Sequence, residues 1–172
     1  MTIFLKLPGL ALAAFFLCLA PGMSGQCDID FDFGEALFAV SPDPALGETF
    51  VAGMLDESYF DVLHILIPVD ASAILPDFNL PVDSVVVQPN STIIEDGSVV
   101  YQGVVFTDTV TQEQFFADEI GLEVLFNNNG DSGNPSGFLA GEQYCAAIQG
   151  APNRSGIYRI SIDVFGLSLI HI

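Results

Sequence analysis

The sequence predicts an all-β protein, an antiparallel β-sandwich, from three observations. Short segments rich in β-branched and aromatic residues alternate apolar and polar side chains, a pattern typical of strands with one buried face. Prolines, glycines and asparagines separate these segments, as in sandwiches of about seven short strands. Hydrophobic residues make up 51% of the chain, and phenylalanine occurs 15 times, which is enough for the core of one domain.

Residues 1–25 are predicted to be a cleaved signal peptide. Lys6 provides a positive charge, and the uncharged apolar run 10–20 is shorter than the ~20 residues that span a bilayer. A proline–glycine pair and small residues precede the expected cleavage site. The alternative is a lipoprotein signal, but neither Cys18 nor Cys27 directly follows a small residue. We therefore expect a secreted or cell-surface protein.

The chain is strongly acidic, with 22 Asp and Glu against 3 Lys and Arg. Cleavage would remove Lys6 and leave Arg154 and Arg159 as the only Lys or Arg residues, for a net charge of −20. Such a charge repels nucleic-acid phosphates and anionic membranes, so neither is an expected partner. No later apolar run is long enough for a transmembrane helix. The expected partner is an unidentified extracellular protein or glycan.

Two cysteines remain after cleavage, Cys27 and Cys145. In an exported chain a pair of cysteines is expected to form one disulfide. This bridge would close a long loop and stabilise the domain by ~2–4 kcal/mol. The alternative is a pair of free thiols.

The N-terminal part, residues 26–46, is interpreted as a strand followed by a proline-rich connection. Residues 27–33 alternate aspartate with apolar side chains, which predicts the strand, and prolines and a glycine at 41–47 predict the loop. The main domain is expected to span residues 47–166. Its first strands are predicted at 48–54 and 59–68, and the second of these is apolar on both faces.

The middle of the domain is predicted to contain two β-branched strands, 82–89 and 98–106. A proline-punctuated connection, 70–81, precedes them, and a turn-like segment, 90–97, separates them. Residues 111–120 are predicted to form one short helical turn, because Thr111 and Gln114 have capping-box spacing.

The last predicted strands are 121–126, 143–150 and 156–164, and the polar loop 127–137 follows the first of them. Gly150, Pro152 and Gly156 predict a tight connection between the final two strands, because glycine adopts backbone angles forbidden to other residues and proline cannot donate to a ladder. Alternation in the last strand predicts one apolar face made of Tyr158, Ile160, Ile162 and Val164.

Residues 167–172 break this alternation without a turn. Their sequence matches a translation of the transposase mosaic end used in sequencing libraries, so adapter read-through is expected there. On that interpretation the domain is truncated at the C-terminus after Gly166. The alternative is a natural apolar terminus.

The pattern Gly150-x-Pro152-x-x-x-Gly156-x-Tyr158 resembles a turn and strand of immunoglobulin-like N-terminal modules. These modules occur in bacterial proteins exported by the type IX secretion pathway. Segments upstream are similar too, so the resemblance covers most of residues 41–165. It implies an immunoglobulin-like fold and an exported protein, and no catalytic residues. The chain departs from the family in lacking an extra cysteine pair near the polar loop.

Candidate sites for chemistry are few. His64, within an apolar segment, is interpreted as a hydrogen-bonded structural residue rather than a catalytic one. Asn127, Asn129 and Asp131 are calcium candidates, because calcium prefers oxygen ligands, although the loop lacks the glycine and glutamate of an EF-hand. The alternative is an Asx-rich turn whose side chains hydrogen-bond their own backbone.

The resulting hypothesis is a non-enzymatic module that acts as a spacer, display or adhesion domain, with no cofactor. Two alternatives remain open. The chain could be the N-terminal accessory domain of an exported enzyme whose catalytic part lies beyond Gly166, or it could bind calcium or carbohydrate through the polar loop.

Overall fold

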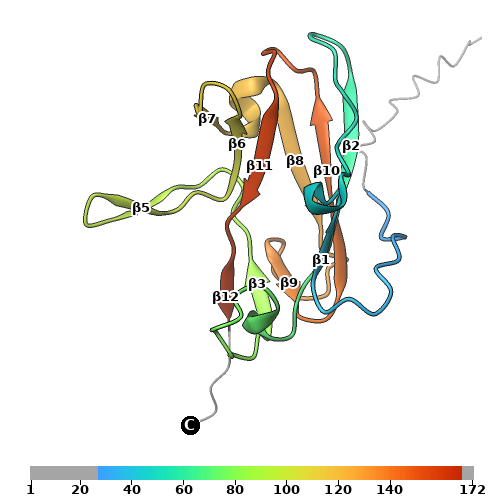
Figure 1. The fold of residues 1–172 in the computed structure, drawn as a ribbon, viewed down its shortest axis with the longest axis vertical. Coiled ribbons are helices and arrows are strands. Elements are labelled where there is room, and N and C mark those ends of the chain that lie inside the picture. Colours follow the sequence, from blue (N-terminus) through green and yellow to red (C-terminus); the bar gives the residue numbers. More distant parts are fainter. Residues whose placement is uncertain (1–26, 168–172) are drawn as a thin grey trace, which may run out of the picture.

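The computed structural model describes residues 27–167 (Figure 1). The predicted signal peptide and residues 168–172 lie outside the described residues. The described chain is all-β, with 39% of residues in strands and no helix of seven or more residues. Every strand pairing is antiparallel, which confirms the predicted fold class and is compatible with a β-sandwich. None of the helices in this region is long and apolar enough to cross a membrane.

The strands are short, with a maximum of eight residues. They are β1 (Ala39–Ser41), β2 (Tyr59–Leu66), β3 (Ser84–Val86), β4 (Ile93–Glu95), β5 (Ser98–Tyr101), β6 (Val104–Asp108), β7 (Gln114–Phe115), β8 (Leu122–Asn127), β9 (Gly137–Leu139), β10 (Gln143–Gly150), β11 (Tyr158–Ile162) and β12 (Phe165–Leu167). Three single-turn 3-10 helices connect them: η1 (Pro44–Leu46), η2 (Ala71–Ala73) and η3 (Ala117–Ile120).

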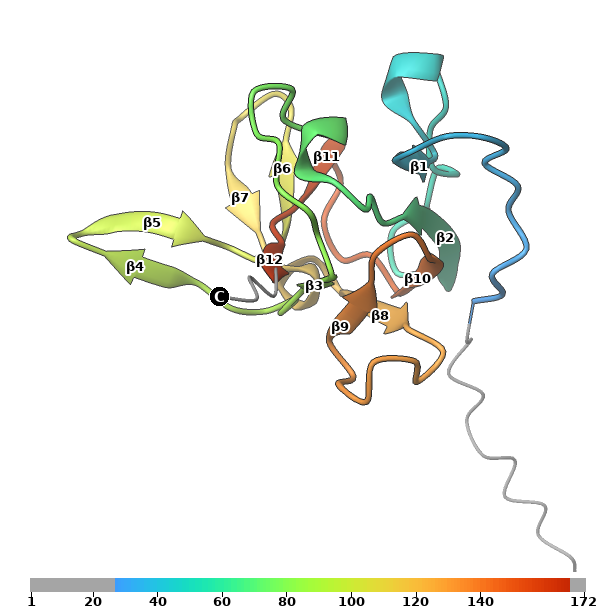
Figure 2. The same cartoon turned by 90° about the horizontal axis from the view of Figure 1, so that it is seen from below.

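The strands form four sheets, with orders β1-β2-β10-β8, β11-β6-β7, β12-β3-β9 and β4-β5. The first sheet makes one layer, and β11 and β12 run one after the other along the opposite layer (Figure 1). The β4–β5 hairpin projects from the body in both Figure 1 and Figure 2. β10 and β11 follow each other in the sequence but lie in different sheets.

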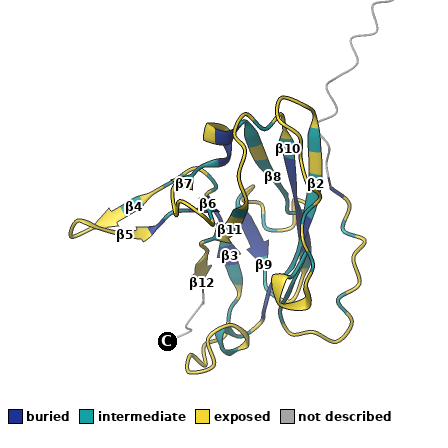
Figure 3. Ribbon diagram, turned by 45° about the horizontal axis from the view of Figure 1, so that its top comes forward, coloured by how far each residue is buried: buried dark blue, intermediate teal, exposed yellow. Residues whose placement is uncertain are grey.

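The core lies between these layers. Its buried members come from β3, β6, η3, β9, β10 and the residues beside them: Ile67, Val85, Val87, Val104, Phe106, Ala117, Ile120, Phe138, Tyr144 and Ile148. Figure 3 shows β9 and β10 as mainly buried and the β4–β5 hairpin as mainly exposed. A second, smaller cluster on the other face of β10 contains Cys27, Cys145 and Ala147.

The predicted disulfide is present and explains the place of the N-terminal segment. Cys27 and Cys145 are joined in a bridge with a Cα–Cα distance of 6.0 Å. The predicted strand over residues 27–33 is wrong, because this segment pairs with no other strand in the described chain. Instead the bridge holds it against the outer face of the first sheet, where Ile29 contacts the smaller cluster. The alternation of apolar and acidic residues in this segment therefore reflects the packing of individual side chains and not pairing with a neighbouring strand.

Four further expectations need correction. The predicted strand over residues 98–106 is divided into two strands, β5 and β6, which lie in different sheets. Residues 48–54 form no strand but an irregular connection. The segment 90–97 is more than a turn, because β4 forms within it and pairs with β5 around Asp96 and Gly97, both at positive φ. The helical turn begins at Ala117 rather than Thr111, and the residues before it form β7.

Candidate functional site

The connection between β10 and β11 turns the chain from one layer to the other, and its glycines have specific roles. Gly150 has φ 140°, and a Cβ there would collide with the carbonyl oxygen of Gly121. A Cβ on Gly156 would lie 2.8 Å from the ring of Tyr158. Between them the Pro152 carbonyl accepts a hydrogen bond of 2.8 Å from the Asp56 N–H. The four residues of the sequence motif therefore fix one turn.

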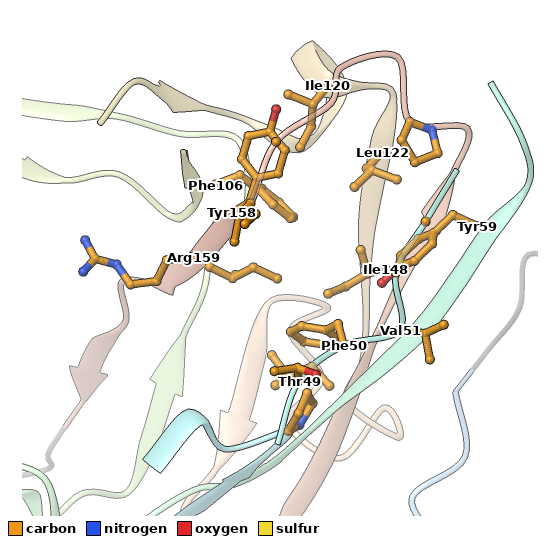
Figure 4. A pocket seen from close by; sticks show the side chains of 18 of the residues that line it. Thr49, Phe50, Val51, Tyr59, Phe106, Ile120, Leu122, Ile148, Tyr158 and Arg159 are labelled. Atoms are coloured by element: carbon orange, nitrogen blue, oxygen red, sulfur yellow. The ribbon is translucent and has the colours of Figure 1, made fainter. Parts of the chain in front are cut away.

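This turn closes one end of an open apolar groove with a volume of about 770 Å³. One wall comes from β11, and the opposite wall comes from β1, the connection 48–55 and β2 (Figure 4). Side chains of both layers form its floor. The floor and inner walls are apolar or aromatic, with Phe50, Tyr59, Leu63, Phe106, Ile120, Leu122, Ile148, Tyr158 and Ile160 among the lining residues.

The groove leaves the predicted apolar face of β11 only half-covered. Tyr158, Ile160 and Ile162 pack against the core, as the alternation predicts, but each remains partly exposed. Val164, predicted on the same face, lies beyond the end of β11 and is exposed. Figure 4 shows that the Arg159 side chain points away from the groove. The polar face of β11 is thus exposed to solvent, and its apolar face is only partly covered by the core.

One backbone edge of β11 is unpaired. β11 is the end strand of its sheet, and its neighbour is β6. At the two ends of this ladder, Thr109 N–H donates to the Ile157 carbonyl and Asp163 N–H donates to the Gly103 carbonyl, both at 2.8 Å. Hydrogen-bonded and non-hydrogen-bonded positions alternate along an antiparallel ladder. The N–H and C=O groups of residues 158, 160 and 162 therefore face away from β6.

No hydrogen bond within residues 27–167 engages these three outward-facing positions. Figures 1 and 2 place β6 on one side of β11, so the unpaired edge faces the groove side. Across the groove, the connection 48–55 belongs to no sheet. The groove therefore combines apolar side chains with free backbone donors and acceptors.

A tyrosine on each wall contributes a hydroxyl. Burial, the charge of Asp61 and a hydrogen bond to the Asp61 carboxylate raise the pKa of Tyr59 to about 12. Burial, with the charge of Asp108, also raises the pKa of Tyr158. Both hydroxyls are therefore neutral at physiological pH and serve as hydrogen-bonding groups.

Arg154 is engaged at the end of the groove. Its guanidinium lies 4.4 Å from the centre of the Phe115 ring and 3.3 Å from the Glu113 carboxylate. The ion pair is exposed, so it contributes little stability. Arg159 has no ion pair within the described chain.

The calcium candidates lie in one loop, and two of them already have partners. Asn127 Nδ2 donates to the Cys27 carbonyl at 2.9 Å, and its Oδ1 accepts from Asn129 N–H at 3.1 Å. The Asp131 carboxylate accepts from the Tyr144 hydroxyl at 3.3 Å. Asn128 and Asn134 also accept from backbone N–H groups two residues on. The Asx-rich turn is therefore confirmed, and Asn127, the last residue of β8, holds the N-terminal segment through its bond to Cys27.

Within the described residues, no group of three or more His, Cys, Asp or Glu side chains is placed to hold a metal ion. His64 lies in β2 and stacks on Phe31, with ring centres 5.1 Å apart. Its Nδ1 is buried and has no hydrogen-bond partner in the described chain, so the expected hydrogen bond is not formed at that atom.

Comparisons with family models, curated proteins and solved structures found no match to this chain. The candidate site thus rests on geometry. Sequence reasoning missed the wall formed by residues 48–55, because it interpreted residues 48–54 as a strand. No local signal in the sequence distinguishes this wall from a strand, because the exposure of Val51 and Leu55 depends on the tertiary structure.

Proposed function

We propose that this chain is a non-catalytic, immunoglobulin-like module of an exported protein, and that it binds an extracellular partner through the groove beside β11. The groove carries this proposal, because an open apolar surface bordered by free backbone groups is suited to binding a macromolecule. The module would act in adhesion or display, secreted or at the cell surface.

The disulfide supports an extracellular location. Cys145 is fully buried in β10, and its bridge closes a sequence separation of 118 residues. Such bridges persist in oxidising compartments and are rare in the cytosol. The apolar run at 10–20 supports export through a signal peptide. The close packing of Gly156 under Tyr158 gives a physical basis for the motif that resembles type IX-secreted modules.

The test uses the oxidised mature chain on beads, incubated with a panel of purified extracellular proteins and with a glycan array. A Val51→Asn/Leu55→Asn variant removes two exposed apolar side chains from the groove. A Val110→Asn/Leu37→Asn variant makes the same exchanges at exposed positions outside it.

A bound partner that the groove variant loses and the matched control retains would support the proposal. Equal retention by both variants, or no binding across both panels, would contradict it. Equal unfolding midpoints of the two variants would show that the comparison reports on binding rather than on folding.

A further inference from the structure

We propose that the unpaired edge of β11 binds an extended segment of another protein as an added antiparallel strand, with apolar side chains at alternate positions and a net positive charge. This inference rests on the proposed binding function of the groove and names the class of its partner.

The backbone of β11 supplies the first step. Residues 158, 160 and 162 direct their N–H and C=O groups away from β6. An antiparallel strand can satisfy all of these groups, since each of its residues opposite one of the three would exchange two hydrogen bonds with it. Main-chain bonding of this kind gives affinity in strand addition. An antiparallel direction matches every pairing in the described chain.

The side chains supply the second step. Tyr158, Ile160 and Ile162 all face the groove, and residues directly opposite each other on paired strands have side chains on the same face. The side chains opposite these three would therefore enter the groove. They would meet Phe50 and Ile148, so apolar residues are favoured there. The same alternate positions thus make the backbone bonds and fill the groove.

The charges around β11 indicate the charge of the partner. Arg159 lies on the polar face of β11 and has no ion pair within the described chain, so an acidic residue opposite Arg159 would be complementary. Asp163 follows the end of β11, and its carboxylate already accepts a hydrogen bond of 2.8 Å from the Gln102 N–H. Residues 27–167 contain 22 acidic and two basic residues, a net charge of −20. Positive flanking residues would therefore be attracted, whereas a second copy of this chain would be repelled.

The probe is a capped peptide, Lys-Lys-Val-Thr-Val-Glu-Val-Lys, in which the three valines would lie opposite Ile162, Ile160 and Tyr158. Two derivatives carry one backbone N-methyl group each. The first has it on the central valine, whose N–H would bond to the Ile160 carbonyl. The second has it on the threonine, whose N–H would point away from β11. Both have the same composition and charge.

Titration is followed by amide NMR of the oxidised mature chain. We expect binding that weakens with added salt and shifts the amide signals of Tyr158, Ile160 and Ile162. The valine N-methyl group should lower the affinity about tenfold, the typical cost of one lost hydrogen bond, and the threonine N-methyl group by less than about twofold.

Three results of the titration would overturn the inference, and one property of the free protein would do the same. The three results are no binding by the parent peptide, equal effects of the two N-methyl groups, and signal shifts confined to another surface. A protein that is already a dimer through β11 would also overturn it, since a second copy would then occupy the edge. If the peptide fails while groove-dependent capture on beads persists, strand addition is wrong but the proposed binding function stands.

Discussion

β10 and β11 are consecutive strands, but both their sequence patterns and their surroundings differ: β10 is apolar without a break from Tyr144 to Ile148, whereas β11 alternates apolar and polar residues. β10 pairs with β2 on one edge and β8 on the other, and both of its faces are covered. β11 pairs with β6 alone and leaves its apolar face half-exposed. The continuous apolar run of β10 thus fits a strand covered on both faces, and the alternation of β11 predicts which side chains share its apolar face. How deeply that apolar face is buried depends on what lies beside its unpaired edge, which the alternation does not show.

The disulfide anchors the buried strand, and its loss should give the largest effect. Replacing both Cys27 and Cys145 by alanine should lower the free energy of unfolding by about 4 kcal/mol, because the bridge restricts a long loop in the unfolded chain. Urea unfolding of the variant and of the oxidised wild type measures this. A loss below about 1 kcal/mol would show that packing alone holds the N-terminal segment on β10.

Matched isoleucines test the comparison directly. Ile148 in β10 is 1% exposed, whereas Ile160 in β11 is only partly buried. We expect Ile148→Ala to lower the free energy of unfolding by about 3 kcal/mol and Ile160→Ala by about 1 kcal/mol. The second effect is smaller because folding removes less of the Ile160 side chain from water. Urea unfolding of both variants measures the difference. Equal losses would mean that β11 is as well covered as β10.

The tyrosine on the wall opposite β11 should give a smaller effect, confined to alkaline pH. The folded pKa of Tyr59 is raised from 10.0 to about 12, so folding favours its neutral form. Its contribution to stability is complete below pH 10 and is lost as the pH rises towards 12. Tyr59→Phe should remove this part of the pH dependence of unfolding, with the wild-type protein measured in parallel. Unchanged dependence in Tyr59→Phe would contradict the assignment.

Calcium should have no effect. Asn127 and Asp131 already bond to groups of the protein. We therefore expect millimolar calcium to leave the thermal unfolding midpoint unchanged, with magnesium as the control. A calcium-specific increase would show that the loop rearranges to bind the ion.

The sequence predicted β2, β8, β10 and β11 well, because each combines β-branched or aromatic residues with clear turn signals at its ends. The same reasoning failed for 27–33 and 48–54. These segments also alternate, but strand formation requires a partner edge, and pairing between distant segments is not visible in a local pattern. The disulfide was predictable because only two cysteines remain after the signal peptide.

The groove was not predictable in the same way. Tyr158, Ile160 and Ile162 were expected to be core residues. The prediction is right about the face on which these side chains lie, but it does not capture their partial exposure. Their exposure depends on the connection 48–55 lying across from β11 rather than pairing with it. Gly150 and Gly156 were identified as turn residues, but their close contacts with Gly121 and the Tyr158 ring depend on the tertiary structure.

Amide hydrogen exchange of the free, oxidised, monomeric protein tests the central claim that one edge of β11 is open. Amides of residues 159, 161 and 163 should be protected, as should those of β10, because they bond to neighbouring strands. Amides of residues 158, 160 and 162 should exchange rapidly. Protection of residues 158, 160 and 162 as well would contradict the account, since the edge would then already be paired.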